Sequence, residues 1–432
     1  MHRLSATTVW YANEAAASFL GMLAFTVTAV YYVTEVGMSP LQLVLVGTLM
    51  EVSIFVFEVP TGVAADTYSR RLSIVVGTFV MGIAVTLFGA FGEVWPILAA
   101  NALWGFGYTF TSGAFDAWLA DELGPERLAG VYLRGAQLGR LAALAGIGTS
   151  VALAVVDLRL PIVAAGGGTI LLALLLASTM PETGFAPLPR EERGSFAQMG
   201  HTGREGARLV RARPALLAIL GIAAFGGMWS EGFDRLWQAH FIRDIGLPSL
   251  GGLEPVVWFG VFGAGTILLS IAVAHPLGKR LERVGLERLA TALFWLDASL
   301  LVSALVFGLA GRFWLALVSY FAVGLARNVA GPIFQTWLNR NIEESGVRAT
   351  VLSITSQADA VGQWAGGPAI GLVGNAFSIR AALSVGALCV APALGLYRRA
   401  ARHHGEVSVL DALADGGPAD GETAPGSPGT GV

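Results

Sequence analysis

The chain alternates between long apolar runs and short polar breaks. We count twelve runs of about twenty or more predominantly apolar residues. A helix rises ~1.5 Å per residue, so about twenty such residues cross the ~30 Å hydrocarbon core of a bilayer. The breaks fall at charged residues, glycine and proline, where helices tend to end. The predicted spans are roughly 9–33, 40–64, 72–92, 95–121, 128–155, 160–180, 214–241, 253–277, 288–310, 313–338, 349–375 and 379–400.

Composition favours a membrane protein over a soluble one. Of the 432 residues, 54% are hydrophobic and 13% are charged, whereas soluble proteins carry about 25% charged residues. The mean hydropathy of +0.65 agrees with this excess of apolar side chains. The fold class that we predict is therefore an all-α membrane protein of twelve transmembrane helices in two six-helix halves.

Several functional classes lack support in the sequence. The net charge of −3 favours no nucleic-acid partner, and the single cysteine, Cys389, excludes an internal disulfide. No histidine spacing suits a metal ion, and no glycine-rich loop follows the ATP-binding pattern. We therefore expect no metal, no cofactor and no enzymatic activity.

The basic residues predict the orientation in the membrane. If the N-terminus lies inside, the predicted inner segments hold 19 lysines and arginines, and the outer loops hold four. Cytoplasmic loops of membrane proteins carry such an excess of basic residues. We therefore expect a multi-pass protein of the plasma membrane with both termini in the cytoplasm.

The two halves of the chain resemble each other. The stretch SGAFDAWLADEL at 112–123 resembles GPIFQTWLNRNI at 331–342, and GVAADTYSRR at 62–71 falls on GKRLERVGLE at 278–287. Parallel repeats of six spans are a known transporter design, in which the substrate site lies near the membrane midplane between the halves.

The repeat divides the chain into four parts. A polar, basic stretch separates the sixth span from the seventh, and the residues after the last span lack apolar periodicity, which indicates disorder. The parts are an N-terminal six-helix half at 1–180, a cytoplasmic linker at 181–213, a C-terminal six-helix half at 214–402 and a disordered cytoplasmic tail at 403–432.

A charged motif follows the second span. Gly62, Asp66, Arg70 and Arg71 are spaced as Gly-x-x-x-Asp-x-x-x-Arg-Arg. Together with the span count, the topology and the repeat, this motif resembles the loop motif of the major facilitator superfamily, and the chain over 9–400 looks like a twelve-span bacterial drug exporter of that family.

The resemblance implies a cytoplasmic gate. Gly62 would allow close helix approach, Asp66 would lock the gate against the other half, and Arg70 and Arg71 would hold the loop by charge. A simpler explanation of the two arginines is that they only satisfy the excess of basic residues inside. The acid has no such explanation, because acidic residues contribute little to orientation.

Two positions in the second half extend the predicted gate, and two within the motif depart from the family pattern. Gly278 lies over Gly62 and Glu282 over Asp66 in the second half, so we include both in the predicted gate. The chain departs from the family pattern at Thr67, where a basic residue is usual, and at Ser69, where glycine is usual. The departures predict a gate that closes less firmly.

Acidic residues within the predicted spans mark candidate proton sites. A charge at mid-bilayer is costly, so it usually faces a wet cavity or a partner. Glu51 and Glu58 share the second span and have no basic residue three or four positions away. Burial disfavours the charged form of a carboxyl, which lets it bind and release protons near neutral pH. We predict proton coupling at these two residues, with Asp116, Asp234 and Asp359 as further candidates.

Some of these charges also have structural explanations. Asp116 and Arg134 lie at similar depths in adjoining spans, so a structural ion pair is the favoured interpretation. Arg327 and Asp359 are both near mid-depth in the second half and are candidates for pairing. Each pair, once formed, would leave fewer free carboxylates for proton coupling.

Three acids of the seventh and ninth spans, Glu231, Asp234 and Asp297, differ in their surroundings. Glu231 and Arg235 are four residues apart on one helical face and can neutralise each other. This pairing leaves Asp234 as an uncompensated acid near the outer mouth. Asp297 lies near mid-depth in the ninth span, which the family resemblance places at the periphery, so we discount it as a coupling site.

Large aromatic residues occupy two of the spans that line the substrate cavity in the superfamily that this chain resembles. The fourth span offers Trp104 and Tyr108, the seventh offers Trp229 and Phe233, and Arg327 in the tenth adds a charge. Aromatic walls with few polar groups suit an amphiphilic molecule better than a sugar. Packing against neighbouring helices or lipid explains each aromatic residue, taken singly, at least as well.

These observations predict a secondary transporter that works by alternating access. We expect proton-coupled efflux of a hydrophobic or amphiphilic, drug-like small molecule by a monomer whose other partners are protons and the lipid bilayer. The alternative is a proton-coupled uptake symporter for a small metabolite. That alternative stays open because the Gly-rich, Pro-containing stretch at 362–371, which resembles the family's antiporter motif, lies in the eleventh span, whereas exporters carry the motif in the fifth.

Overall fold

Each predicted span folds as a helix or as a pair of helices. The computed structural model describes residues 3–186, 214–249, 254–281, 285–342 and 348–399. The first half contains α1 (Ala6–Thr34), α2 (Pro40–Thr67), α3 (Arg70–Ala90), α4 (Val94–Thr109), α5 (Ala114–Leu123), the short η1 (Pro125–Arg127), α6 (Leu128–Ala154) and α7 (Arg159–Thr179). The second contains α9 (Pro214–His240), the π-helical turn η2 (Phe241–Ile245), α10 (Val257–Leu281), α11 (Leu286–Leu309), α12 (Phe313–Arg340), α13 (Arg348–Ala376) and α14 (Ile379–Leu388).

The helical membrane fold is confirmed. Within the described residues, nine helices are long and apolar enough to cross a membrane by length and composition. One of these nine runs through α14 to Arg399. Helix starts follow local sequence signals: α2 begins at a capping box in which the Ser39 hydroxyl accepts from the Gln42 amide, with Pro40 in the first turn. The linker after residue 186, the tail after residue 399 and Glu282 lie outside the described residues.

The fourth predicted span, 95–121, is not continuous. It consists of α4 and α5, which are separated by a turn at residues 110–113. Gly113, the residue before α5, adopts a φ of 69°, a left-handed conformation that favours glycine. The interruption separates α5 from the regular helix of α4, with consequences for Asp116 described below.

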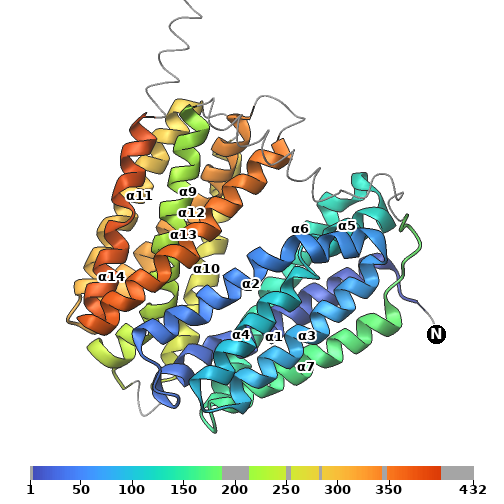
Figure 1. The fold of residues 1–432 in the computed structure, drawn as a ribbon, viewed down its shortest axis with the longest axis horizontal. Helices are drawn as coiled ribbons and strands as arrows, with labels where there is room; N and C mark the ends of the chain where they lie inside the picture. Colours follow the sequence, from blue (N-terminus) through green and yellow to red (C-terminus); the bar gives the residue numbers. More distant parts are fainter. Residues whose placement is uncertain (1–2, 187–213, 250–253, 282–284, 343–347, 400–432) are drawn as a thin grey trace, which may run out of the picture.

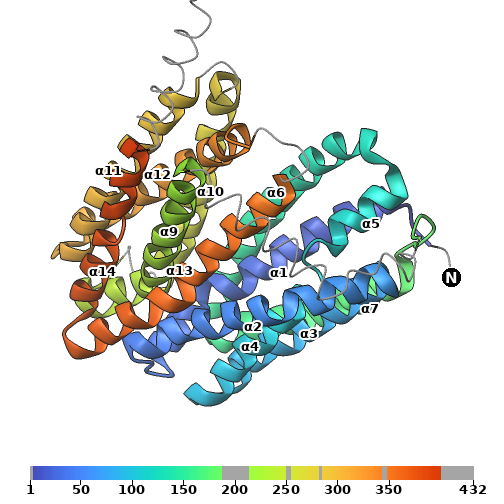
Figure 2. The ribbon, with the colours of Figure 1, turned by 45° about the horizontal axis from the view of Figure 1, so that its top comes forward.

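Two groups of helices make up the molecule, α1–α7 and α9–α14. Within each group the helices pack mainly on one another, whereas between the groups the main contact joins α2 to α13. The groups meet at one end of the molecule and diverge toward the other (Figures 1 and 2). We call the first the joined end; it comprises the start of α2, the end of α13, residues 35–39 and η2. The opposite end, with α5 and the starts of α9 and α11, is the open end.

The apolar core follows this division. One large cluster of buried side chains at the joined end combines residues of both groups, including Val44 of α2, Phe241 of η2 and Ile370 of α13. At the open end each group has its own smaller cluster, built around Trp118 in the first group and Trp337 in the second. Both tryptophans are fully buried, as expected for equivalent positions of the sequence repeat.

Candidate transport cleft and gate

Glu51 and Glu58 lie on the face of α2 that is turned toward α13. Both line a cavity of about 370 Å³, whose other wall includes Ser353, Ser356 and Gln357 of α13. The Ser112 hydroxyl donates to the Glu58 carboxylate at 3.3 Å. Among the described residues, neither glutamate forms an ion pair. The structure therefore places both glutamates between the two helix groups, and neither forms an ion pair with a basic residue in the described part of the chain.

Glu231 and Arg235 form the ion pair that the sequence predicts. The Arg235 Nε lies 3.1 Å from the Glu231 Oε1, and Glu231 is almost fully buried. Both residues belong to α9, and their side chains lie against Gly47 of α2 in the first group. A Cβ at position 47 would overlap both side chains. A larger residue at position 47 would therefore displace the ends of these two side chains from α2.

Asp234 is not the uncompensated acid that the sequence suggests. It accepts two hydrogen bonds from the Arg327 guanidinium, at 2.6 and 3.0 Å. Arg327 in turn lies over the ring of Trp229, 5.2 Å from its centroid. The predicted pairing of Arg327 with Asp359 is therefore wrong: the Asp359 carboxylate accepts from the Gln363 side chain at 2.7 Å instead. Depth along a helix does not reveal which face a side chain occupies, and Asp234 is the acid on the face that α12 approaches.

A cavity of about 680 Å³ lies within the second group. Trp229, Arg327 and Asp359 line it, together with Asp297 of α11 and Tyr397 near the end of the last span. Asp297, which the sequence analysis discounted, is hydrogen-bonded to Tyr397 and faces this cavity. The sequence signal for Asp297 was a lone acid in the apolar stretch FWLDASLL. The expectation that the ninth span lies at the periphery led us to discount it.

A second cavity of about 500 Å³ lies within the first group. Trp104 and Tyr108 line it and stack on each other, with ring centroids 5.5 Å apart. Asp116 and Glu14 are its acidic residues. The predicted pairing of Asp116 with Arg134 is wrong.

Asp116 and Arg134 do not meet because of how α5 and α6 are rotated about their axes. After the turn at residues 110–113, α5 directs Asp116 toward Tyr132 and Glu14. Tyr132 and Arg134 differ by about 200° around α6, at about 100° per residue, and Arg134 is exposed on another face. Phe233, the remaining predicted cavity residue, is buried and packs against Trp229 and Phe307. It does not line any of the three cavities.

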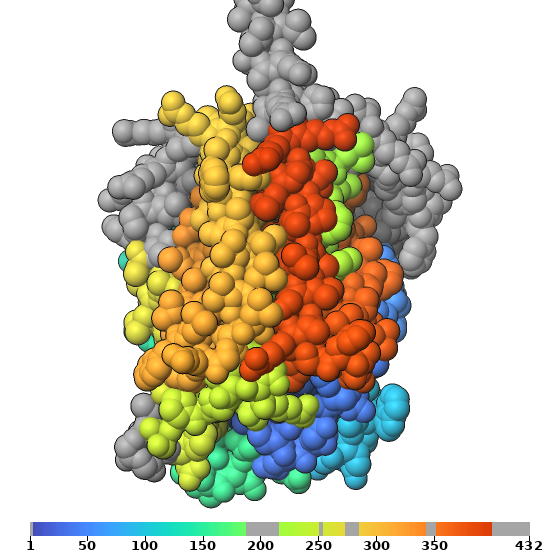
Figure 3. Space-filling model, turned by 90° about the vertical axis from the view of Figure 1, so that its left-hand side faces the viewer, coloured from blue at the N-terminus to red at the C-terminus, as the bar shows by residue number. Residues whose placement is uncertain are grey.

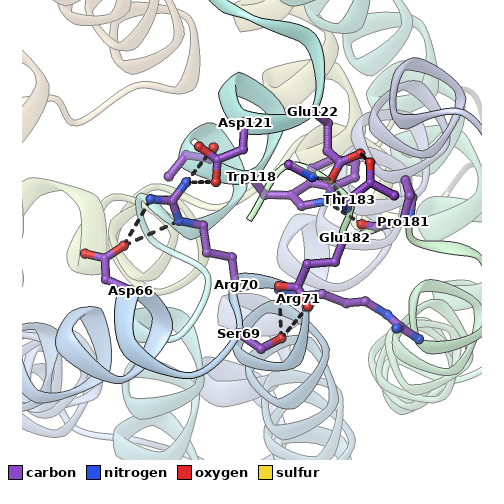
Figure 4. Close-up of polar contacts among 12 residues, drawn as sticks. Asp66, Ser69, Arg70, Arg71, Trp118, Asp121, Glu122, Pro181, Glu182 and Thr183 are labelled. Carbon is purple, nitrogen blue, oxygen red and sulfur yellow. Dashed lines mark hydrogen bonds and ion pairs between the residues drawn. The ribbon is translucent and has the colours of Figure 1, made fainter. Parts of the chain in front are cut away.

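The predicted gate motif forms a polar network at the open end (Figure 4). Arg70 forms ion pairs with Asp66, at 3.3 Å, and with Asp121 of α5, and it donates to the Ala117 carbonyl at 2.9 Å. The Arg71 side chain donates to the carbonyl of Ala177 in α7. The two arginines therefore hold α2, α3, α5 and α7 together, which the charge-orientation explanation alone does not require.

Sequence reasoning missed the acids that complete this network. Glu182 accepts from the Ser69 hydroxyl at 2.8 Å and from the Arg71 amide at 2.9 Å, and Glu122 accepts from the Thr183 hydroxyl at 2.7 Å. The indole of Trp118 donates to the Pro181 carbonyl at 2.7 Å. These partners are more than fifty residues from their donors, so no local spacing reveals them.

Three other gate positions need a separate description. Ser69, where the family pattern has glycine, caps α3 by accepting from the Leu72 amide at 2.9 Å. A Cβ at Gly62 would meet nothing within 4 Å, so this glycine makes no close helix contact in the conformation described. Gly278 lies within α10, but its surroundings, like Glu282, are outside the described part of the chain.

Comparisons with known proteins agree with this arrangement. The family model described as Major Facilitator Superfamily matches residues 15–296. The uncharacterized MFS-type transporter YxaM of Bacillus subtilis (strain 168) is 23% identical over 385 residues, which cover 88% of this chain and 92% of that protein.

Solved structures of similar fold have low sequence identity to this chain. The nucleoside transporter NupG matches with a TM-score of 0.74 at 11% identity, over 92% of this chain and 99% of that one. The peptide transporter POT in complex with sulfate matches with a TM-score of 0.70 at 16% identity, over 94% of this chain and 95% of that one. At such identities the likeness establishes the fold alone.

Proposed function

Because the chain belongs to the major facilitator superfamily, we propose that it is a secondary transporter that exports a hydrophobic or amphiphilic small molecule in exchange for protons. Among the described residues, the two helix groups share an apolar core at the joined end and have separate cores at the open end, and this difference carries the proposal. Groups that share a core at the joined end and have separate cores at the open end can rock about the cleft between them. Such rocking exposes a central site to each side of the membrane in turn.

The carboxylates in the cleft support proton coupling. Glu51 and Glu58 line the cavity between α2 and α13 and have no ion-pair partner among the described residues. Asp359 and Asp297 line the cavity of the second group, and Asp116 lines that of the first. Ionisable groups inside the membrane usually face water or serve in proton transfer. We therefore propose Glu51 and Glu58 as the main coupling sites.

The cavity walls support an amphiphilic cargo. The stacked pair Trp104–Tyr108 lies in one cavity, and Trp229 with Arg327 over its ring lies in the other. Flat aromatic surfaces beside a few charged groups suit molecules with an apolar body and a polar end. The charge of Arg327 is compensated by Asp234, so it is not a free anion site in this conformation.

The arginine distribution supports the orientation and the site of action. We propose that the open end faces the cytoplasm and the joined end faces outward, in the plasma membrane, with a monomer as the working unit. The motif at Asp66, Arg70 and Arg71 would then close the cytoplasmic side when the groups rock together. In the conformation described, Asp66 pairs within its own group, as an open gate requires.

Transport by reconstituted vesicles under an imposed pH gradient tests this function. We expect an amphiphilic substrate to move against its gradient when protons flow the other way, and Glu51→Gln with Glu58→Gln to abolish proton-driven movement while substrate exchange at equal pH remains. Glu93→Gln is the matched control, because Glu93 is exposed at the start of α4 and its side chain makes no capping hydrogen bond.

Two results would contradict these assignments. Full proton-driven transport by the double variant would remove Glu51 and Glu58 from coupling. Proton-driven accumulation of the substrate on the side into which the protons flow would favour the alternative, an uptake symporter.

A further inference from the structure

A buried histidine at the joined end is hydrogen-bonded to two groups that both accept. His240, the last residue of α9, has no exposed surface. Its Nε2 lies 3.0 Å from the Phe307 carbonyl oxygen of α11, and its Nδ1 lies 2.8 Å from the Asp244 Oδ2 of η2. A carbonyl oxygen accepts only, so Nε2 must carry a hydrogen.

The second contact requires one more proton. With Nε2 protonated, a neutral ring has a lone pair at Nδ1, which would face a carboxylate lone pair at 2.8 Å. A hydrogen bond forms only if a proton lies between these atoms, on the ring or on the carboxyl. In either form, His240 and Asp244 together hold one proton more than a neutral histidine beside a carboxylate.

The surroundings of the pair contain few other charges. Asp244 and Arg380 of α14 are the charged residues that act on His240. Arg380 donates to the Asp244 backbone carbonyl at 3.3 Å, and it disfavours a net positive charge here. The pair with one added proton is neutral overall, which suits a site beside an arginine.

Other helices approach the neighbouring residue Phe241 rather than the imidazole ring. They do so with Phe262 of α10 and with Phe313 and Tyr320 of α12. Of these, only Tyr320 is titratable, and it is neutral at physiological pH. Among the described residues that contact this turn, no further acid or base therefore competes for the proton.

The same turn carries the hydrogen bonds that hold the two groups together. Arg243, next to Asp244 in η2, donates to the carbonyl oxygens of Val33 and Met38 at 3.1 and 2.9 Å. Val33 lies in the last turn of α1 and Met38 in the connection from α1 to α2, both in the other group. Figure 3 shows the yellow-green segment after α9 lying beside the blue segment around the start of α2 at this end. The conformation of η2 therefore positions an interdomain contact.

We infer that His240 and Asp244 form a proton-binding site that controls the joined end. With the proton bound, η2 is fixed to α11 and Arg243 reaches the α1–α2 connection. Loss of the proton places two lone pairs against each other, loosens η2 and weakens the Arg243 contact. Acid conditions on this side therefore favour the joined conformation, and rising pH favours separation of the groups at this end. This inference rests on the proposed alternating access and adds a proton site that the carboxylates of the cleft do not supply.

Distance measurements across the joined end test the inference without any transport. Spin labels would be attached at Trp95→Cys in α4 and Phe377→Cys after α13, both highly exposed, in a Cys389→Ser background. A second label pair at Tyr68→Cys and Thr291→Cys would report on the open end. A charge-assisted hydrogen bond shifts a two-state equilibrium by about tenfold or more. We therefore expect the separated population at the joined end to rise about tenfold between pH 5.5 and pH 8.5, with a midpoint in the range of a histidine.

Two substitutions separate a proton switch from a merely structural contact. In Asp244→Asn the amide can donate to Nδ1 while a neutral His240 donates to Phe307, so we expect the joined end to stay closed at every pH. In His240→Gln the titratable imidazole is gone, and the amide keeps its N–H donors at every pH, so the pH response should be lost. Glu93→Gln, at the same end, should keep the wild-type response.

The outcomes are decisive even if a variant fails to fold. Absence of a pH response in the wild-type protein, or a normal response in Asp244→Asn, would overturn the inference. Because labelling reports conformation in the absence of substrate, a failed transport assay would refute the proposed function and leave this result intact.

Discussion

The joined end and the open end solve the same packing problem in different ways. At the joined end, one apolar cluster draws Val44 and Ile370 from different groups, and glycine brings the backbones together. A Cβ at Gly371 of α13 would lie 2.9 Å from the Leu41 Cα of α2. At the open end, each group closes its own core around one tryptophan, Trp118 or Trp337. A moving interface therefore needs each group to be stable without its neighbour at one end.

The polar contacts differ in the same way. Three hydrogen bonds between described side chains and backbone cross from one group to the other, and all lie at the joined end: two from Arg243 and one from the Leu41 amide to Asn375 at 3.0 Å. At the open end, the network around Arg70 and Glu182 stays within the first group. Polar bonds between groups are thus few and directed at backbone atoms, which can be released without stranding a buried charge.

The largest expected effects come from the same substitution, glycine to leucine, at opposite ends of the molecule. Gly371→Leu would push Leu41 and Val44 away from α13, and overpacking of this kind costs ~1–3 kcal/mol. We expect the joined conformation to be depopulated by about tenfold or more, since each ~1.4 kcal/mol changes a population ratio tenfold. Distances between spin labels across the joined end would measure the shift.

Gly62→Leu is the matched counterpart at the open end. A side chain at Gly62 meets open space in this conformation, so the variant should fold normally. If Gly62 allows close approach when the open end closes, the leucine should hold the protein in the conformation described and stop transport. Normal transport by Gly62→Leu would contradict the gate role of this residue, and an unchanged joined population in Gly371→Leu would contradict the packing argument.

At the polar network of the open end we expect a loss of stability rather than a shift between conformations. Arg70→Gln removes contacts with Asp66, Asp121 and the Ala117 carbonyl. The loss of hydrogen bonds from a mostly buried charged group should lower the free energy of unfolding by ~1–3 kcal/mol. Thermal unfolding of the purified variant and wild-type proteins would measure this decrease in stability. Arg71→Gln, which removes one side-chain contact to Ala177, should have a smaller effect; equal effects would mean that the network contributes nothing beyond charge.

The sequence predicted what depends on composition and on local spacing. Apolar length alone located the helices, and the four-residue spacing of Glu231 and Arg235 predicted their ion pair correctly. The pairing of Asp234 with Arg327 was missed because the two residues are 93 positions apart. Helical rise gives the depth of a residue in the membrane, but pairing also requires knowledge of helix rotation and of neighbours, which one sequence does not supply.

The break in the fourth span shows the same limit. A run of apolar residues predicts helix over 95–121, and the stretch TSG at 111–113 was read as part of it. Tertiary contacts make use of the turn: the Phe110 carbonyl accepts from Ser73 of α3 at 2.7 Å, and Ser112 donates to Glu58. The acids of the gate network, Asp121 and Glu182, were likewise invisible because their partners lie on other helices.

The smallest expected effect distinguishes a wet cleft from a dry one. Asp234 and Arg327 are 43% and 38% exposed as side chains, and exposed ion pairs contribute only ~0–1 kcal/mol. Asp234→Asn should therefore change the free energy of unfolding by no more than about 1 kcal/mol. Glu35→Gln is the control, because Glu35 forms a similarly exposed pair with Arg159 at 3.3 Å on the surface of the joined end. Thermal unfolding of both variants should give similar small shifts. A loss of ~3–5 kcal/mol in Asp234→Asn alone, the cost of a stranded buried charge, would mean that the space beside α9 and α12 is closed to water and that the two groups do not open a shared aqueous cleft there.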